Sequence, residues 1–265
     1  MLRSLYTSAT GMKAQELLID NTANNLANVN TAGFKRSHLN FADLIYTTLE
    51  QPGTVIAAGQ VSPTGLQLGS GVRANGTTKV FTPGTLEQTG NSLDVAIEGD
   101  GFFKVLLPNG DLRYTRDGAF RIDGNGQLMT AGGYLLDGGI TVPNGINLSK
   151  LNIGEDGTIT GIVSGQTETA VQLGQLQLAS FLNPAGLSSE GGNLYAATPA
   201  SGNEVLGLPG QNGAGIVRQG FLEGSNVEVV TELISLISAQ RAYEINSRAI
   251  RAGDEMLSTS NEIIR

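Results

Sequence analysis

The chain has 265 residues, enough for one or two domains with a sizeable hydrophobic core. Its formal net charge of −8 and its pI near 4.7 argue against nucleic acid or an anionic membrane surface as the main partner. Cysteine is absent, which excludes disulfides, thiolate metal sites and a cysteine nucleophile, and no apolar run approaches the roughly 18–20 residues that cross a bilayer.

The first 30 residues predict an amphipathic helix. Apolar residues return at alternating steps of three and four, interrupted only at Glu16, which is the spacing of a coiled-coil seam. This N-terminal apolar seam consists of Leu2, Leu5, Ala9, Met12, Ile19, Ala23 and Leu26. A second face is mostly small or polar and carries Ser4, Thr7, Gly11, Ala14, Leu18, Asn21, Asn25 and Asn28. The same residues lack the apolar core of a secretory signal peptide, so no cleaved signal is expected.

Asparagines crowd the end of this helix, at positions 21, 24, 25, 28 and 30. Asparagine is a poor helix former because its side chain competes for the backbone. Gly33 predicts a left-handed turn that ends the helix, and Phe34 is positioned to anchor that turn.

The middle of the chain predicts strands. Residues 46–71 are rich in Gly, Pro, Ser and Thr without a clear period, which favours an extended connector. Residues 72–221 contain short apolar or alternating runs separated by turn dipeptides such as Asn109-Gly110 and Asp123-Gly124, which predict a β-rich domain.

A second long helix is predicted at the C-terminal end. Ser225 to Glu228 have the spacing of a capping box, from which a helical pattern runs to Arg265. One face is mixed but largely apolar, with Val229, Leu233, Leu236, Gln240, Tyr243, Ser247, Ile250, Asp254, Leu257 and Ile264. The other face is dominated by small residues and comprises Ala239, Ala242, Asn246, Ala249, Gly253, Met256 and Ile263.

Together these patterns predict a mixed α and β fold. Two helices with two packing faces each cannot bury all four against one another, so we expect them to pair within the chain as a coiled coil and also to pack against other chains. The predicted divisions are 1–45 for the first helix and turn, 46–71 for the connector, 72–221 for the β-rich central domain and 222–265 for the second helix. A helix buried inside an ordinary globular domain is the alternative interpretation.

No motif for catalysis or for cofactor binding is present. Gly99-Asp100-Gly101 lacks the third glycine of a dinucleotide loop and lies between predicted strands, and the single histidine, His38, is expected at the surface. Carboxylate pairs for glycoside hydrolysis are defined by distance in space, so five acids stay open as candidates: Asp94, Glu98, Asp100, Asp111 and Asp117. We therefore expect no catalytic residue, no metal site and no cofactor, with a glycan-binding or glycan-acting surface protein as the minor alternative.

Both ends of the chain carry long family motifs. Residues 23–36, ANNLANVNTAGFKR, and residues 225–250, SNVEVVTELISLISAQRAYEINSRAI, resemble the terminal signatures of the bacterial flagellar rod, hook and hook-associated axial proteins. The segments DVAIEGDGFF, YTRDGAF and LPGQNGAGIVRQGFLEGSNV are most similar to the distal rod members of this family. Residues 51–73 resemble the insert that distal rod subunits carry after the first helix. A proximal rod or hook subunit is the alternative within the family.

The resemblance implies a structural subunit that is not an enzyme. Such subunits leave the cell unfolded through the flagellar type III export apparatus and assemble helically beneath a rod cap. The product is a straight, rigid, hollow drive shaft that crosses the periplasm in the basal body and transmits torque from motor to hook. The implied partners are other copies of the chain, the proximal rod proteins, the hook protein and the periplasmic and outer-membrane bushing ring proteins. Neither nucleic acid nor membrane insertion is implied.

The helix faces described above predict the assembly positions, and the resemblance implies roles for further residues. The assembly and coiled-coil positions are Leu5, Ala9, Met12, Ile19, Ala23, Asn24, Leu26, Asn28, Leu233, Leu236, Gln240, Tyr243, Ile250 and Leu257. The signature turn comprises Asn30, Gly33 and Phe34, and the insert is marked by Gln51, Pro52, Pro63 and Gly65. Phe41 and Ile45 resemble an export-gate signal, with a core-facing patch as the alternative. The asparagines Asn24 and Asn28 either fix the register of subunit contacts or face the solvated lumen.

Overall fold

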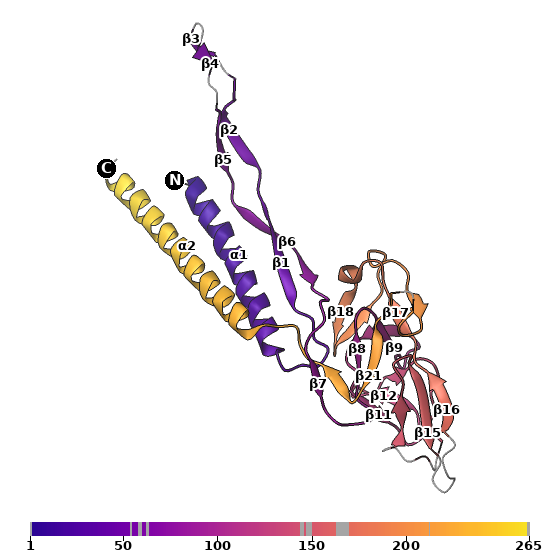
Figure 1. The fold of residues 1–265 in the computed structure, drawn as a ribbon. Coiled ribbons are helices and arrows are strands. Elements are labelled where there is room, and N and C mark those ends of the chain that lie inside the picture. Colours follow the sequence, from indigo (N-terminus) through magenta and orange to yellow (C-terminus); the bar gives the residue numbers. More distant parts are fainter. Residues whose placement is uncertain are drawn as a thin grey trace. The chain divides into compact units, whose positions relative to one another are not determined.

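The computed structural model describes residues 2–53, 55–57, 60–61, 64–143, 146, 150–162, 170–211 and 213–263. The fold is mixed α and β, as predicted, with one helix near each end and a β-rich middle (Figure 1). Helix α1 spans Leu2–Ala27 and helix α2 spans Val229–Ile263. Neither helix has an apolar stretch sufficient to cross a membrane. The predicted positions Pro63 and Ile264 lie outside the described residues.

The chain divides into two compact units that are each discontinuous in sequence. The first unit contains Met1–Leu26, Ser37–Thr78 and Val229–Arg265, and the second contains Ala27–Arg36 and Lys79–Glu228. The signature turn therefore belongs to the β-rich second unit, although the helix that precedes it belongs to the first.

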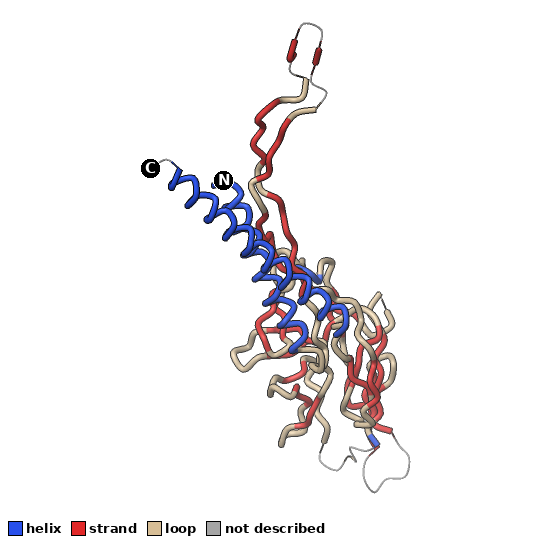
Figure 2. Tube along the Cα trace, turned by 90° about the vertical axis from the view of Figure 1, so that its left-hand side faces the viewer, coloured by secondary structure: helices blue, strands red, loops and turns tan. Residues whose placement is uncertain are grey.

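In the first unit the two helices lie side by side next to pairs of strands (Figures 1 and 2). The strand pairs are β1 (Ser37–Asp43) with β6 (Val72–Lys79), β2 (Tyr46–Glu50) with β5 (Leu66–Gly69), and β3 (Val55–Ala57) with β4 (Gln60–Val61). In the antiparallel β2–β5 pair, Tyr46 lies opposite Gly69 and Thr47 opposite Leu68. Every side chain of β2 and β5 is exposed, which is unusual for strands that contain leucine and tyrosine.

The second unit is built from antiparallel strands. Its largest sheet has nine strands, in the order β11-β12-β13-β9-β10-β19-β18, with β17 pairing to β9 and to β20. Their bounds are β9 (Phe102–Leu106), β10 (Leu112–Thr115), β11 (Phe120–Ile122), β12 (Leu128–Thr130), β13 (Leu135–Leu136), β17 (Leu178–Ser180), β18 (Ser188–Gly191), β19 (Leu194–Ala196) and β20 (Val205–Gly207).

Smaller sheets complete this unit. A three-stranded sheet contains β14 (Asn152–Ile153), β15 (Thr158–Ile162) and β16 (Ala170–Gln175). The pair β8 (Val95–Glu98) and β21 (Ile216–Gln219) and the pair β7 (Leu86–Gln88) and β22 (Phe221–Glu223) join distant parts of the sequence. A 3-10 turn, η2, spans Pro184–Gly186.

Two hydrophobic clusters form the core of the second unit. The larger one includes Val95, Ile97, Phe103, Val105 and Val217, all almost completely buried. The smaller one is aromatic and contains Phe102, Tyr114, Phe181 and Tyr195, with Phe81 packed against it in edge-to-face geometry. Burial of Tyr195 raises the pKa of its phenol to about 12. Strands β9 and β17 contribute to both clusters, with Phe103 and Leu178 in the larger one and Phe102 and Ala179 in the smaller one, because successive side chains of a strand point to opposite faces.

The predicted capping box at the start of the second helix is wrong. Helix α2 begins at Val229, and the Ser225 hydroxyl accepts a hydrogen bond from the Val227 N–H at 3.3 Å before the helix starts. The neighbouring Asn226 side chain binds backbone groups of another segment, which holds residues 225–228 outside the helix.

Candidate functional site

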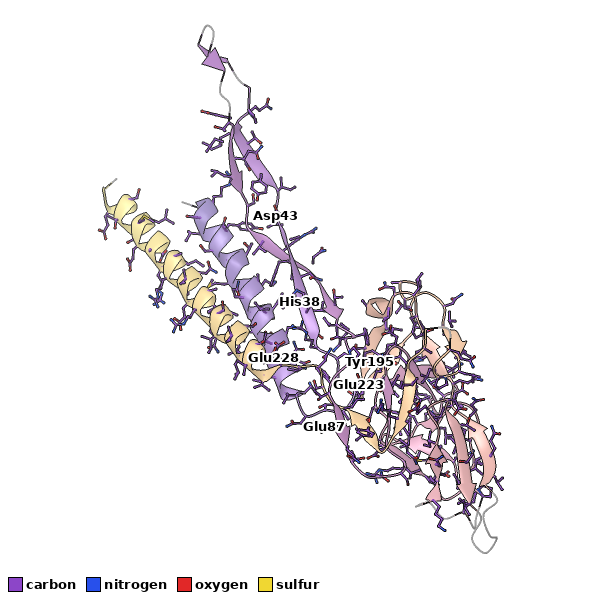
Figure 3. All side chains as sticks on the ribbon, in the orientation of Figure 1. His38, Asp43, Glu87, Tyr195, Glu223 and Glu228 are labelled. Atoms are coloured by element: carbon purple, nitrogen blue, oxygen red, sulfur yellow. The ribbon has the colours of Figure 1, made fainter. Side chains whose placement is uncertain are left out.

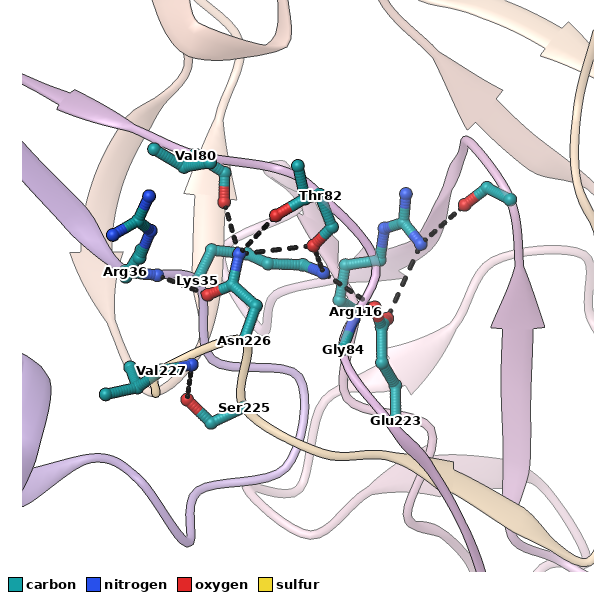
Figure 4. Close-up of polar contacts among 11 residues, drawn as sticks. Lys35, Arg36, Val80, Thr82, Gly84, Arg116, Glu223, Ser225, Asn226 and Val227 are labelled. Carbon is teal, nitrogen blue, oxygen red and sulfur yellow. Dashed lines mark hydrogen bonds and ion pairs between the residues drawn. The ribbon is translucent and has the colours of Figure 1, made fainter. Parts of the chain in front are cut away.

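A buried ion pair joins the N-terminal motif, residues 23–36, to the segment of residues 208–227. The Lys35 ammonium lies 2.6 Å from a carboxylate oxygen of Glu223, and both side chains are completely buried. The same ammonium donates to the Thr82 carbonyl at 2.8 Å, and the Gly84 N–H donates to the carboxylate at 3.0 Å (Figure 4). The pair is therefore supported by hydrogen bonds on both charges, which a buried ion pair needs to be stable.

Arg116 adds a second cation to this cluster. Its guanidinium lies 3.4 Å from the second Glu223 oxygen and donates to the Gly99 carbonyl at 2.9 Å. Among the described residues, its Nε has no hydrogen-bond partner. Burial lowers the pKa of Lys35 and of Arg116, and the Glu223 carboxylate opposes this shift in both. A single buried carboxylate thus compensates two buried cations, which makes Glu223 the central residue of the cluster.

Asn226 connects the same two motifs through its amide. Its carbonyl oxygen accepts a hydrogen bond from the Arg36 N–H at 2.8 Å, and its amide nitrogen donates to the Val80 carbonyl at 2.8 Å and to Thr82 (Figure 4). The backbone N–H of Asn226 also donates to the Phe34 carbonyl. Both ends of the side chain are used, so replacing it would leave several backbone groups without a partner.

The signature turn has the left-handed backbone that its glycine predicts. Gly33 has φ of +69°, and its N–H donates to the Glu223 carbonyl at 2.7 Å. A Cβ atom at this position would lie 2.6 Å from the Asp117 nitrogen, so only glycine fits. The prediction that Gly33 ends the helix is wrong, because α1 already ends at Ala27 and a separate turn follows.

Phe34 is the other anchor of this turn. Its ring is buried and lies 4.6 Å from the Lys79 ammonium, whose nitrogen also donates to the Lys35 carbonyl. Asn30, the third predicted residue of the turn, is exposed. Gly33 and Phe34 therefore fix the turn to the second unit, whereas Asn30 does not.

Asn25 is the most buried asparagine of α1. It is almost completely buried, and its amide exchanges two hydrogen bonds of 2.9 Å with the Ser37 backbone and donates to Glu232 at 3.3 Å. Asn21 also donates to the Ser37 carbonyl, at 2.8 Å. Of the two asparagines predicted to act in assembly, Asn24 is exposed and Asn28 is half-buried. The amides of Asn21 and Asn25 thus fix the chain after the turn onto its own helix.

The two helices run antiparallel. Asn25 contacts Glu232, Gly11 faces Asn246, and a Cβ atom added to Gly253 would lie 2.6 Å from Leu5. Glu232, Asn246 and Gly253 recur at multiples of seven residues, the spacing of a helix pair that stays in register. The predicted small or polar faces therefore carry most of these contacts, together with Leu5 of the apolar seam.

Much of the predicted assembly surface remains accessible in the single chain. Ala9, Ala23, Leu233, Gln240 and Tyr243 are exposed. The half-buried positions are Leu5, Met12, Ile19, Leu26, Leu236, Ile250 and Leu257. Exposed apolar residues on a long helix indicate a surface that another molecule covers.

The predicted export residues and the insert residues lie in the strand segment of the first unit. Phe41 is exposed on β1, and Ile45, between β1 and β2, is the more exposed of the two. Gln51 and Pro52 are exposed, and Gly65 is half-buried. A Cβ atom at Gly65 would lie 2.5 Å from the Glu50 carbonyl oxygen, so this glycine permits the end of β2 and the start of β5 to approach closely.

Four of the five acids that the sequence left open for glycoside hydrolysis make hydrogen bonds in turns or an ion pair. Asp94 accepts hydrogen bonds from Thr89 and Asn91, Glu98 pairs with Arg218, and Asp111 accepts from Asn109. Asp117 accepts from the Ala119 N–H, and Asp100 is exposed. His38 is exposed on β1, as predicted (Figure 3). Within the described part of the chain, no group of acids and histidine could hold a metal ion.

Sequence patterns missed Lys35, Arg116, Glu223 and Asn226. All four lie inside the motifs that carry the family resemblance. Those motifs indicate the family, but they do not indicate which contacts these residues make. A usable signal was available for Glu223, which follows Phe221-Leu222 in a chain where charged residues make up only 15%. A carboxylate within an apolar strand is rarely buried without a partner.

Comparisons with known proteins identify three family segments. Residues 5–35 match the family described as "Flagella basal body rod protein", residues 96–161 the "Flagellar hook protein FlgE/F/G D1 domain", and residues 218–263 the "Flagellar basal body rod FlgEFG protein C-terminal". Lys35, Arg116 and Glu223 come one from each segment. The buried charge cluster thus joins all three.

Full-length relatives carry the same description. "Flagellar basal-body rod protein FlgG" of Buchnera aphidicola subsp. Schizaphis graminum is 48% identical over 99% of this chain and 100% of the relative. The protein of that name from Borreliella burgdorferi is 45% identical over both complete chains, and that from Bacillus subtilis is 36% identical over 97% of each. The chain belongs to the flagellar basal-body rod protein family. It is a structural subunit of the distal rod in the basal body, and it is not an enzyme.

Proposed function

We propose that this subunit polymerises helically with its own copies into a straight, rigid, hollow shaft that transmits torque from motor to hook. The observation that carries the proposal is the group of large apolar side chains left exposed in the first turns of α2: Val229, Val230, Leu233, Ile234 and Ile237. Monomeric proteins rarely leave such continuous apolar surface in water, and burying it releases ~25 cal/mol per Å².

The terminal helices form the assembly domain of this proposal. Residues 1–45 and 222–265 form the terminal assembly domain, in which α1 and α2 pair as a coiled coil, residues 72–221 form the outer β-rich domain, and residues 46–71 are the insert. The antiparallel contacts of α1 with α2 support the pairing within one subunit. Asn24 and Asn28 act in the register between subunits, because a displaced buried amide loses its partner at a cost of ~1–3 kcal/mol.

The insert braces neighbouring subunits. Support comes from strands β2 and β5, in which every residue is exposed, since an isolated two-stranded hairpin is marginal in water and gains stability from a covering partner. Phe41 and Ile45 are exposed and so are accessible for a second role, recognition by the type III export apparatus. The further partners in this proposal are the proximal rod proteins, the hook protein, the rod cap and the bushing ring proteins.

Electron microscopy of the concentrated protein tests the proposal. Straight helical rods are expected, with a deletion of residues 51–73 giving rods that curve or bend more easily. A chain that stays monomeric at every concentration would contradict polymerisation, and straight deletion rods of unchanged stiffness would contradict bracing by the insert.

A further inference from the structure

Strand β21 comes late in the chain but lies in the core of the β-rich unit. Its Val217 is completely buried, belongs to the larger hydrophobic cluster and lies opposite Ile97 of β8. Among the described strands, β21 is the only one that pairs with β8, whose apolar side chains are all buried. Without β21, buried backbone groups of β8 would lose their hydrogen-bond partners, which is unfavourable inside a core.

The side chain of Gln219 connects β21 to a second sheet. Its amide nitrogen donates to the carbonyls of Ser92 and Leu151, each at 2.7 Å. Its carbonyl oxygen accepts a hydrogen bond from the Ile153 N–H at 3.1 Å. Ser92 precedes β8, and Ile153 belongs to β14 of the three-stranded sheet. One side chain of β21 therefore holds β14 and the segment before β8 together.

Strand β22 supplies polar partners to the N-terminal part of the unit. The Glu223 carbonyl accepts a hydrogen bond from the Gly33 N–H, and the Glu223 carboxylate pairs with the buried cations of Lys35 and Arg116. Strands β21 and β22 together form residues 216–223, which we name the closing segment. The closing segment thus contacts three earlier parts of the unit: the signature turn, β8 and β14.

We propose that the closing segment is a folding latch, so that the β-rich unit folds only after residues 216–223 have docked against β7, β8 and the signature turn. The earlier residues of the unit, 27–36 and 79–215, contain most of its strands. Alone, however, they leave β8 unpaired, and they bury Lys35 and Arg116 without the carboxylate that pairs with both. Because burial of a charge without its partner is strongly unfavourable, these earlier residues do not fold by themselves.

The latch delays folding while the chain is being made. A chain is synthesised from its N-terminus, so β21 and β22 are the last strands of the unit to appear. The unit therefore stays unfolded until nearly all of its residues are present. The benefit of this delay rests on the proposed function, in which the type III export apparatus takes up unfolded chains.

Amide hydrogen exchange of the full-length chain tests the latch, with Val217→Asp as the variant that prevents docking. A charge cannot be accommodated without a partner at this completely buried position. The readout is the protection of amides in β9 and β10, which belong to the nine-stranded sheet and do not pair with the closing segment. Val171→Asp is the matched control, because Val171 lies on strand β16 of the same unit and is 44% exposed.

The protection of β9 and β10 is expected to fall by more than about a hundredfold in Val217→Asp and by no more than about threefold in Val171→Asp. A smaller fall in Val217→Asp would overturn the latch, because the nine-stranded sheet would then be folded without the closing segment. In the natural chain, the slowest amides of β21 and of β9 should exchange at equal rates, through one opening of the whole unit. Amides of β21 that exchange faster while β9 stays protected would overturn the latch as well.

Polymerisation of the natural chain is measured separately by sedimentation. Both overturning results would therefore leave the proposed function standing. A natural chain that folds with these exchange rates but never polymerises would contradict the proposed function and leave the latch standing.

Discussion

Lys35 and Glu223 are 188 residues apart in sequence and 2.6 Å apart in the fold, and neither side chain is exposed to solvent. Since one belongs to the N-terminal family segment and the other to the C-terminal one, the pair fixes where the two terminal segments enter the β-rich unit. Arg116, from the central family segment, shares the same carboxylate.

Glu223→Gln is expected to destabilise the β-rich unit strongly. The substitution removes the carboxylate that pairs with the buried charges of Lys35 and Arg116, and breaking a buried pair costs about 3–5 kcal/mol. Urea unfolding followed by circular dichroism measures the change. Glu98→Gln is the control, because the Glu98–Arg218 pair is exposed and such pairs contribute at most about 1 kcal/mol. Equal effects of the two substitutions would mean that the buried cluster does not stabilise the fold.

Asn25→Ala is expected to lower the stability of the first unit by about 1–3 kcal/mol, because the Ser37 backbone loses its partners and Glu232 loses a donor. Thermal unfolding and amide hydrogen exchange of α1 report this loss. Asn24→Ala, one position earlier and exposed, should change the stability of the single chain by no more than about 0.5 kcal/mol. Equal stabilities of the Asn25→Ala and Asn24→Ala variants would show that the Asn25 contacts are not formed in solution.

Gly33→Ala is expected to lower the free energy of unfolding by more than the strain of a left-handed backbone alone would lower it. A Cβ atom would collide with the backbone of Arg116 and Asp117, in addition to the strain of φ at +69°. Gly191→Ala separates the two effects, because Gly191 has φ of +90° but no atom within 4 Å of the added Cβ. Chemical unfolding should show a larger loss of stability for Gly33→Ala than for Gly191→Ala. Equal losses would mean that the added Cβ atom does not collide with the backbone of Arg116 and Asp117.

Asp117→Asn should stabilise the protein at neutral pH. Burial raises the pKa of the Asp117 carboxyl above its ordinary value, and Asp94 contributes to the rise against the opposing Ala119 hydrogen bond. A raised pKa in the fold gives stability that is complete below the unfolded pKa of about 3.9 and is lost as pH rises through the folded value. The permanently neutral amide keeps the acceptor for Ala119, so its advantage at pH 7 should disappear towards pH 4.

Asp123→Asn should destabilise the protein at neutral pH, opposite in sign to the effect of Asp117→Asn. Backbone hydrogen bonds from Gln127 and Asn125 lower the pKa of Asp123, so its charged form contributes stability that is present at neutral pH and lost in acid. Urea midpoints at pH 7 and pH 4 for both variants give the comparison. The same sign for the two substitutions at pH 7 would contradict this electrostatic account.

Sequence periodicity predicted the elements better than their contacts. Both helices, the β-rich middle and the left-handed Gly33 follow from local rules of spacing and backbone sterics, and the family followed from long motifs. Periodicity assigns residues to faces, but it does not say which neighbour covers a face. For this reason Asn25 was recognised as part of a polar face while its partners Ser37 and Glu232 were not.

The errors at the helix ends have a common physical cause. The capping box at Ser225 and the helix end at Gly33 were both predicted from local hydrogen-bonding rules. In the fold, Asn226 and Gly33 instead make hydrogen bonds to groups distant in sequence, at Arg36 and Glu223. Tertiary contacts therefore override the local preference at both ends, and the buried charges that accompany them leave no periodic signal.

We expect the exposed face of α2 to assemble the polymer, and the critical concentration of the Ile234→Asp variant measures this dependence. Burial of an isoleucine side chain contributes about 1.5–3 kcal/mol, so its replacement by a charge should raise the critical concentration measured by sedimentation at least about tenfold. Circular dichroism should show an unchanged fold, since Ile234 is exposed in the single chain. An unchanged critical concentration for a folded Ile234→Asp chain would contradict assembly through this face.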